Sequence, residues 1–77
     1  INTDAIIMEL SFFPFQENMP VFHEVVGQLA NYGFSIYDIL SLSLRPLDNA
    51  AGQTDILFLK SDHPLMMDNH WDKDSTY

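Results

Sequence analysis

The stretch AIIMELSFFPF, residues 5–15, decides the fold of this chain. It is a nearly continuous run of apolar residues that is interrupted by one carboxylate, Glu9. An uninterrupted apolar run is typical of a strand that is covered on both faces, as in the sheets of α/β proteins. We therefore predict a strand over residues 5–13, which Pro14 ends because proline cannot donate to a β-ladder.

A helix is predicted to follow this strand, beginning near Pro20 and ending at Gly33. Proline is suited to the first turn of a helix, and glycine to the left-handed position after its last turn. Between them, apolar residues recur with the spacing of one buried helix face: Phe22, Val25, Val26 and Leu29. The polar residues His23, Glu24, Gln28 and Asn31, together with Gly27, fall on the opposite face.

Two further strands are predicted, over residues 34–44 and 55–60. The segment between them, RPLDNAAGQT, has the residues of turns and is predicted to be a loop. A connection of this kind joins antiparallel neighbours, so we expect the last two strands to pair in that way. The predicted order is strand, helix, strand, strand.

This order leaves one face of the predicted sheet without cover, because a single helix packs on one side only. The apolar strands 5–13 and 55–60 nevertheless have the composition of strands that are buried on both sides. We therefore expect an incomplete α/β domain, with residues 1–61 as its carboxyl-terminal portion and its missing amino-terminal part as partner. The chain starts directly before a strand, which also suggests an internal cut in a longer protein.

The composition excludes several classes of function. Eleven acidic residues against three basic ones give a net charge of -8, so no basic patch for nucleic acid can form. No apolar run approaches the roughly 20 residues that span a bilayer, and the amino terminus does not have the pattern of a signal peptide. We expect a cytoplasmic protein without a membrane or nucleic-acid partner. The absence of cysteine excludes disulfides and thiolate metal sites.

Residues 62–77 are predicted to form an acidic, mobile tail. The tail contains the residue types of a metal site, but their spacing fits neither a helical HExxH motif nor a calcium loop, so no metal is expected. The three glycines of the chain are isolated, and no cofactor-binding turn is visible.

Glu9 is the most interesting candidate for a functional group. In open α/β sheets, ligands bind outside the carboxyl ends of the strands, and Glu9 lies toward that end of its strand. Its carboxylate would accept a proton from a substrate hydroxyl or hold that hydroxyl by a hydrogen bond. Two other interpretations stay open: a buried acid that is satisfied by backbone or partner groups, and an exposed acid at a sheet edge.

The loop after the first strand supplies further candidates for contacts with a substrate. Phe13 and Phe15 would form apolar walls, whereas Ser11 and Gln16 would supply polar contacts. The alternative is an ordinary connection whose aromatic rings pack under the helix. Elsewhere, the strand acids Asp38 and Asp55 are candidates for capping loops or for pairing with Arg45, the only arginine of the chain.

Residues 5–60 resemble the carboxyl-terminal portion of FkbM-type methyltransferases. The resemblance is carried by IIMELSFFPF, by ENMPVFHEVVGQLANYGFSIYDI, by the arginine that follows, and by TDILFLK. The most telling part is YGFSIYDI joined to TDILFLK. The loop PFQENMP departs from the family pattern, which usually carries a tyrosine and a glycine there.

The resemblance implies a Rossmann-like class I fold that depends on S-adenosylmethionine. The chain would supply the fifth strand, the following helix and the terminal antiparallel hairpin, whose last strand inserts beside the fifth. The implied activity is methyl transfer to an acceptor, a hydroxyl of a sugar or other small molecule. The fragment alone would bind no cofactor and be inactive. An alternative from the residues themselves is a non-enzymatic acidic module that dimerises through its open sheet face.

Overall fold

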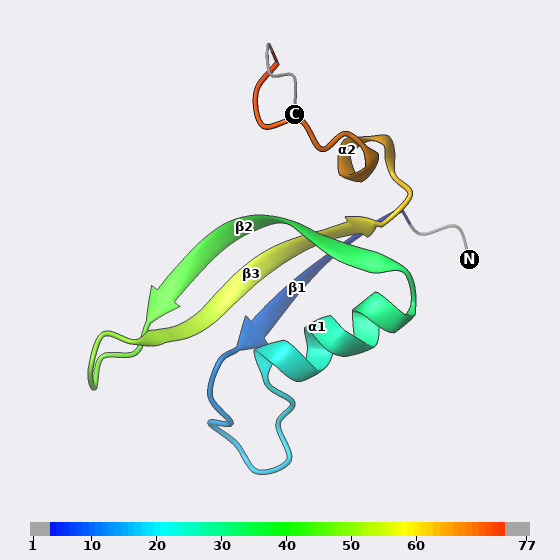
Figure 1. Ribbon diagram of the computed structural model, residues 1–77. Helices are drawn as coiled ribbons and strands as arrows, with labels where there is room; N and C mark the ends of the chain where they lie inside the picture. Colours follow the sequence, from blue (N-terminus) through cyan, green and yellow to red (C-terminus); the bar gives the residue numbers. More distant parts are fainter. Residues whose placement is uncertain (1–3, 74–77) are drawn as a thin grey trace.

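The computed structural model describes residues 4–73 and shows a small α/β arrangement (Figure 1). Its elements are β1 (Ala5–Ser11), α1 (Phe22–Asn31), β2 (Phe34–Leu44), β3 (Ala51–Lys60) and α2 (Pro64–Met67). The first four confirm the predicted order of strand, helix, strand and strand. The domain limits predicted at residues 1 and 77 lie outside the described residues.

The three strands form one open sheet in the order β1-β3-β2. The central strand β3 is antiparallel to both of its neighbours, which confirms the predicted pairing of the last two strands. β1 and β2 therefore run in the same direction, and their arrowheads lie at the same end of the sheet in Figure 1. The helix α1 connects these two strands, which β3 separates in the sheet.

β1 is shorter than predicted, because it ends at Ser11 and not at residue 13. One more bond follows the strand, from the amide of Phe12 to the carbonyl of Gly52 at 2.9 Å. The chain then bends, and the amide of Phe15 donates to the carbonyl of Phe13 at 2.9 Å. Phe12 and Phe13 thus belong to the loop that carries the candidate contacts.

β3 is longer than predicted, because it begins at Ala51 and not at residue 55. Gln53 pairs with Ser11 on one side and with Ser43 on the other, so this part of the predicted loop is paired along both edges. The connection between β2 and β3 is correspondingly reduced to residues 45–50.

α1 has the predicted buried stripe and begins at Phe22, two residues after Pro20. The side chain of Glu24 accepts a hydrogen bond from the amide of Val21 at 3.1 Å, which satisfies one free donor at the helix start. Gly33 has a φ of 85°, so the predicted left-handed glycine after the helix is confirmed.

The core lies between α1 and one face of the sheet. It is built around Leu10, Val25, Ile56 and Phe58, of which Ile56 and Phe58 are each 1% exposed. On the opposite face, Ile7 of β1 is 65% exposed. The two-sided cover expected for β1 is thus missing among residues 4–73, whereas the expected bare second face is present.

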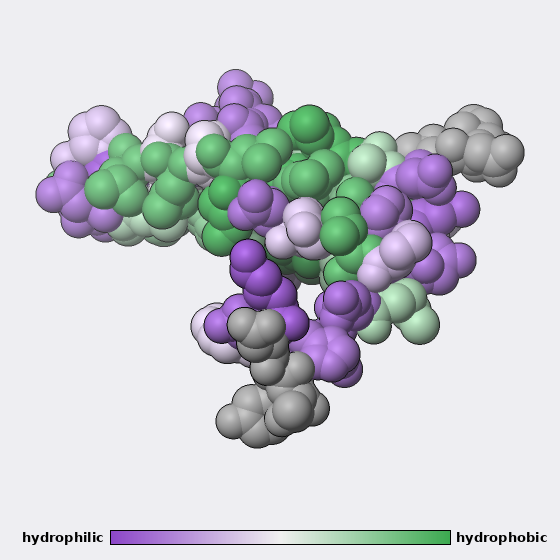
Figure 2. Space-filling model, turned by 90° about the horizontal axis from the view of Figure 1, so that it is seen from above, coloured by the Kyte–Doolittle hydropathy of each residue, from purple (hydrophilic) through white to green (hydrophobic). Residues whose placement is uncertain are grey.

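β2 forms the second edge of the sheet and carries much exposed apolar surface. Figure 2 shows a hydrophobic band along this side of the molecule. Its members on β2 are Ile36, Tyr37, Ile39, Leu40, Leu42 and Leu44, which are between 37% and 62% exposed. α1 therefore covers only part of the sheet.

The predicted mobile tail begins with one helical turn, α2, in the described residues. Its start is capped by His63, whose ring Nδ1 accepts a hydrogen bond from the amide of Leu65 at 3.1 Å. Residues 74–77 of the predicted tail lie outside the described part. Among residues 4–73, no helix has the length and apolar character that a membrane crossing requires.

Candidate functional site at the ends of β1 and β2

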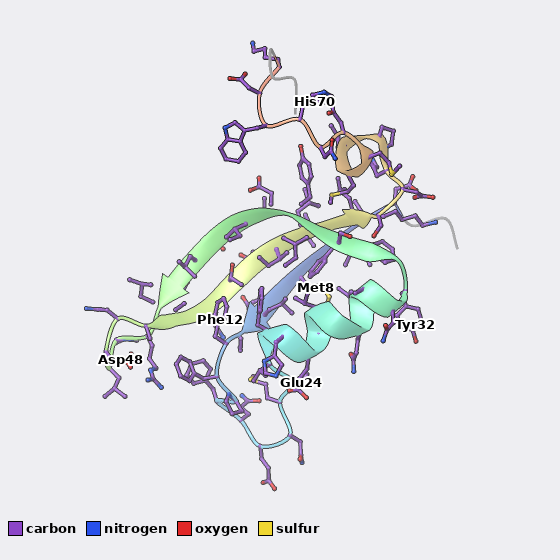
Figure 3. The ribbon with its side chains drawn as sticks, in the orientation of Figure 1. Met8, Phe12, Glu24, Tyr32, Asp48 and His70 are labelled. Carbon is purple, nitrogen blue, oxygen red and sulfur yellow. The ribbon has the colours of Figure 1, made fainter. Side chains whose placement is uncertain are left out.

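Two loops meet at the end of the sheet where β1 and β2 finish. One is the β1–α1 loop, residues 12–21, and the other is the β2–β3 loop, residues 45–50. Figure 3 labels one residue of each loop, Phe12 and Asp48, toward the end of the sheet where the arrowheads of β1 and β2 lie. Ligands of open α/β sheets bind at the carboxyl ends of parallel strands, so this end is the candidate site.

The β2–β3 loop is closed by backbone bonds that fix the position of Arg45. The amide of Arg45 donates to the carbonyl of Ala50 at 2.6 Å, and its carbonyl accepts from the amide of Asn49 at 2.7 Å. Asn49 adopts the left-handed conformation with a φ of 60°, which asparagine tolerates better than most residues. The arginine therefore projects from a compact turn.

Arg45 forms a two-pronged ion pair with Asp48. Its Nε donates to Oδ1 at 3.0 Å, and its Nη2 donates to Oδ2 at 2.5 Å. The Asp48 carboxylate also accepts from the amide of Ala50 at 3.0 Å. The bond from Arg45, followed by that from Ala50, lowers the pKa of Asp48 to about 2. The predicted pairing of Arg45 with Asp38 or Asp55 is wrong, because the nearer carboxylate occurs within its own loop.

The same arginine connects the two loops. Its guanidinium carbon lies 3.9 Å from the centre of the Phe13 ring, within the range of a cation–π interaction. Phe15 packs against Phe13 with ring centres 5.6 Å apart. At the other side of the loop, Phe12 stacks on Phe22 of α1 at 4.8 Å. Aromatic contacts thus hold the β1–α1 loop between the helix and the β2–β3 loop.

A hollow of about 150 Å³ opens beside this arginine, and we call it the Arg45 hollow. Its lining residues are Phe15, Ser43, Leu44, Arg45, Pro46, Gly52 and Gln53. Gly52 is one of these lining residues, and the strands approach closely there: an added Cβ would lie 3.3 Å from the carbonyl oxygen of Ser43. The walls are mainly apolar, and the polar side chains among the lining residues belong to Ser43, Arg45 and Gln53.

A second hollow of about 260 Å³ runs beside β1, and we call it the Glu9 hollow. Its lining residues are Met8, Glu9, Leu10, Ser11, Met19, Pro20, Val25 and Gln53. Gln53 lines both hollows, and its amide nitrogen lies 3.4 Å from the hydroxyl of Ser11. The two hollows therefore share Gln53 as a lining residue.

Glu9 is exposed on the uncovered face of the sheet. It lies directly opposite Asp55 in the β1–β3 register, so two carboxylates share this face. Asp55 accepts a hydrogen bond from the hydroxyl of Ser41 at 2.6 Å. Glu9 itself makes no hydrogen bond or ion pair with another side chain of the described residues and is free to meet a ligand.

The other predicted contacts are spread over this end of the sheet. Ser11 is buried at 8% exposure and lines the Glu9 hollow, whereas Phe15 lines the Arg45 hollow. Phe13 lies under Arg45 and lines neither hollow. Gln16 is exposed in the loop, where its carbonyl accepts from the amide of Met19 at 3.2 Å. Of these predicted contacts, Ser11 and Phe15 thus line the two neighbouring hollows, whereas Phe13 and Gln16 line neither.

Among the polar lining residues of the two hollows, Ser43, Arg45 and Gln53 were not among the predicted contacts. Arg45 is the only arginine in an acidic chain, which was a usable signal. Gln53 gave no such signal, because its importance depends on the pairing of β1 with β3. In the described part of the chain, no three histidine, aspartate or glutamate side chains are grouped to hold a metal ion.

No significant match for this chain was found among protein-family models, curated proteins or solved structures.

Proposed function

We propose that the chain is the carboxyl-terminal part of a methyltransferase domain that depends on S-adenosylmethionine. Its acceptor would be a hydroxyl group of a sugar or another small molecule. The observation that carries this proposal is the strand order β1-β3-β2, with β3 antiparallel between β1 and β2 and α1 connecting these two. A terminal strand inserted beside the fifth strand, as the FkbM resemblance implies, has this order.

The uncovered surfaces of β1 support a larger sheet. β1 pairs with β3 through seven residues without a register shift, and its outer edge has no partner among residues 4–73. Its uncovered face includes Ile7, which is 65% exposed. In the proposed domain, the amino-terminal part would pair with this edge and cover this face.

Glu9 is proposed as the group that receives or holds the acceptor hydroxyl. When a methyl group is transferred to a hydroxyl oxygen, that oxygen loses its proton, and an exposed carboxylate is a suitable acceptor. The candidate contacts with the rest of the acceptor are Ser11, Phe13, Phe15 and Gln16. Their task would be to hold the hydroxyl in line with the methyl donor.

The residues present do not fit S-adenosylmethionine. Gly27 lies within α1, Gly33 follows it, and Gly52 lies within β3, so none forms a glycine-rich turn between a strand and a helix. The cofactor would be held by the amino-terminal part of the domain, and we assign no cofactor-binding residue to this chain. The isolated chain is accordingly proposed to be inactive.

The coding sequence upstream of residue 1 tests the proposal. We expect a strand followed by a glycine-rich turn within about 150 residues. Calorimetry should detect binding of S-adenosylmethionine to the longer protein and no binding heat with the 77-residue chain. A reading frame without such a turn, together with cooperative unfolding of the 77-residue chain, would contradict the proposal.

A second candidate is a non-enzymatic module that dimerises through its open sheet face. The exposed apolar side chains of Ile7 and β2 favour it. The carboxylates of Glu9 and Asp55 oppose it, because a twofold contact over this face would bring four like charges together. Sedimentation of the 77-residue chain separates the candidates, since only the dimeric module requires a stable pair of copies.

A further inference from the structure

The Arg45 hollow is lined by both apolar and polar residues. Phe15, Leu44 and Pro46 supply apolar walls, whereas Arg45 and Gln53 supply hydrogen-bond donors. Ligand pockets commonly combine such walls with a few polar groups that fix orientation. At about 150 Å³, this hollow is smaller than the roughly 300–1,000 Å³ of complete ligand sites. It is large enough for one ring of a ligand.

Arg45 is held in place before any ligand arrives. The two hydrogen bonds from Nε and Nη2 to Asp48 fix the guanidinium, and the ring of Phe13 lies against the face of the guanidinium. No described residue accepts a hydrogen bond from the remaining nitrogen, Nη1. A donor that is already oriented loses little conformational freedom when it binds a ligand oxygen.

The charge around this donor favours a neutral ligand. Asp48 compensates the charge of Arg45 at 2.5 Å, so the pair as a whole is neutral. The chain as a whole carries a net charge of -8, which repels anions. An arginine in this setting serves as a donor to hydroxyl or ether oxygens, whereas attraction of a carboxylate or phosphate would require an uncompensated cation.

We propose that the Arg45 hollow binds a neutral, hydroxylated six-membered ring, which is the acceptor ring of the methyl transfer. Arg45 Nη1 and the Gln53 amide would donate to oxygens of the ring, and its less polar face would lie against Phe15 and Leu44. This assignment rests on the proposed function for the identity of the ring as acceptor. It adds a ring site made by the β2–β3 hairpin, with Arg45 and Gln53 as specificity-determining residues.

Gln53 connects this ring site with the proposed reactive group. Gln53 also lines the Glu9 hollow, together with Glu9 and Ser11, and its side-chain amide lies 3.4 Å from the hydroxyl of Ser11. A ring held beside Arg45 would therefore extend its neighbouring substituents past Gln53 toward the Glu9 carboxylate. The hairpin would select the ring, and β1 would meet the hydroxyl that receives the methyl group.

Nuclear magnetic resonance on the ¹⁵N-labelled 77-residue chain tests this binding without any cofactor. The probes are methyl β-D-glucopyranoside and its 6-carboxylate counterpart, the methyl glucuronide, which differ in charge but share a ring. The neutral probe should shift the signals of the Arg45 Nε–H, the Gln53 side-chain amide and the Gly52 amide. The anionic probe should bind at least about threefold more weakly.

The variant Arg45→Gln should weaken binding of the neutral probe about threefold to tenfold, the usual worth of one or two hydrogen bonds. Lys60→Gln removes the same charge at the other end of β3 and should leave binding unchanged. If Arg45→Gln does not fold, Arg45→Lys keeps the charge, loses the planar fork, and should weaken binding similarly.

Three results of the binding measurements would overturn the ring site. They are the absence of shifts at Gly52 and Gln53 up to the solubility limit of the neutral probe, tighter binding of the anionic probe, and equal losses in Arg45→Gln and Lys60→Gln. A spectrum of the 77-residue chain that lacks the dispersion of a folded sheet would also overturn it, because the hollow then does not exist in this chain. Ring binding without methyl transfer by the longer protein would contradict only the proposed function.

Discussion

The two faces of the sheet are made by the same strands but differ sharply in burial. On the face under α1, Phe58 and Ile56 of β3 are each 1% exposed. On the other face, Ile7 of β1 is 65% exposed, although it pairs with Leu57, an immediate neighbour of both buried residues. The uncovered face also carries the carboxylates Glu9 and Asp55, which lie opposite each other, and it includes Leu59, which is 5% exposed. The two faces therefore differ in composition as well as in cover, and Ile7 is a large apolar side chain that lacks cover.

The two edge strands differ in a related way. β1 keeps one register along its whole length, whereas β2 has three register shifts against β3. Irregularities of this kind twist an edge strand and hinder unwanted pairing. β2 thus has a feature of natural sheet edges that β1 lacks. This contrast agrees with a larger sheet that continues beyond β1.

The largest effect is expected from removing a core ring on the covered face. Phe58→Ala should lower the free energy of unfolding by about 3–5 kcal/mol, because it removes buried contacts and leaves a cavity. Ile7→Ala, the matched change on the uncovered face, should lower it by less than about 0.5 kcal/mol in the 77-residue chain. Urea unfolding of both variants measures the difference.

Equal losses in the two variants would show that something covers Ile7 in solution, such as a second copy of the chain. In the longer protein, the difference should shrink, because the proposed amino-terminal part would bury Ile7 as well. The difference between the two variants, measured in the 77-residue chain and in the longer protein, therefore tests both the fold of this chain and the proposed larger domain.

The elements predicted best are those that local rules determine. The apolar spacing from Phe22 to Leu29 and the glycine at residue 33 define α1 without knowledge of its partners. The start of β3 was missed because Gln53 and Thr54 are polar and follow a glycine, as loop residues do. Their strand conformation depends on pairing with β1, about 40 residues earlier, which local composition does not reveal.

The same limit applies to the candidate site: residues that one strand or loop places could be predicted, whereas contacts between distant segments could not. Glu9 and Phe15 were recognisable from the strand and loop that carry them. The Arg45 hollow forms only when the β1–α1 loop meets the β2–β3 loop. The sharing of Gln53 by two hollows depends on its pairing with Ser11 across the sheet.

The next largest effect on stability is expected from the two glycines within and directly after α1. Gly33→Ala should destabilise the chain by about 1 kcal/mol or more, because its φ of 85° is unfavourable for residues with a Cβ. Gly27→Ala should stabilise it by about 1 kcal/mol, because an added Cβ meets nothing within 4 Å and alanine favours helices. Thermal unfolding followed by circular dichroism should give shifts of opposite sign. A shift of the same sign in both would contradict the described end of α1.

A smaller effect is expected on the uncovered face, where Glu9 lies opposite Asp55. Glu9→Gln should raise the free energy of unfolding by a few tenths of a kcal/mol at low salt, because it removes repulsion between like charges. The gain should disappear near 1 M salt, where charges are screened over about 3 Å. Glu17→Gln removes the same charge from an exposed loop position and serves as control. A gain that persists in high salt would show that repulsion is not its cause.

The smallest effect on stability is expected from breaking the Arg45–Asp48 pair. The change should nevertheless be visible in the pKa of one carboxyl group, that of Asp48. Asp48 has a pKa of about 2 in the folded chain, against an ordinary value of 3.8. A lowered carboxyl pKa contributes stability above about pH 4, and this contribution is lost as the pH falls toward 2.

In Arg45→Gln, the pKa of Asp48 should rise toward 3.8, whereas Lys60→Gln should leave it unchanged. Carboxyl ¹³C shifts followed between pH 1.5 and 5.5 measure the pKa of Asp48 in both variants. An unchanged pKa in Arg45→Gln would mean that the two hydrogen bonds from Arg45 to Asp48 do not form in solution. Arg45 would then no longer be held as the ring site requires, although the contrast between the two faces of the sheet would remain.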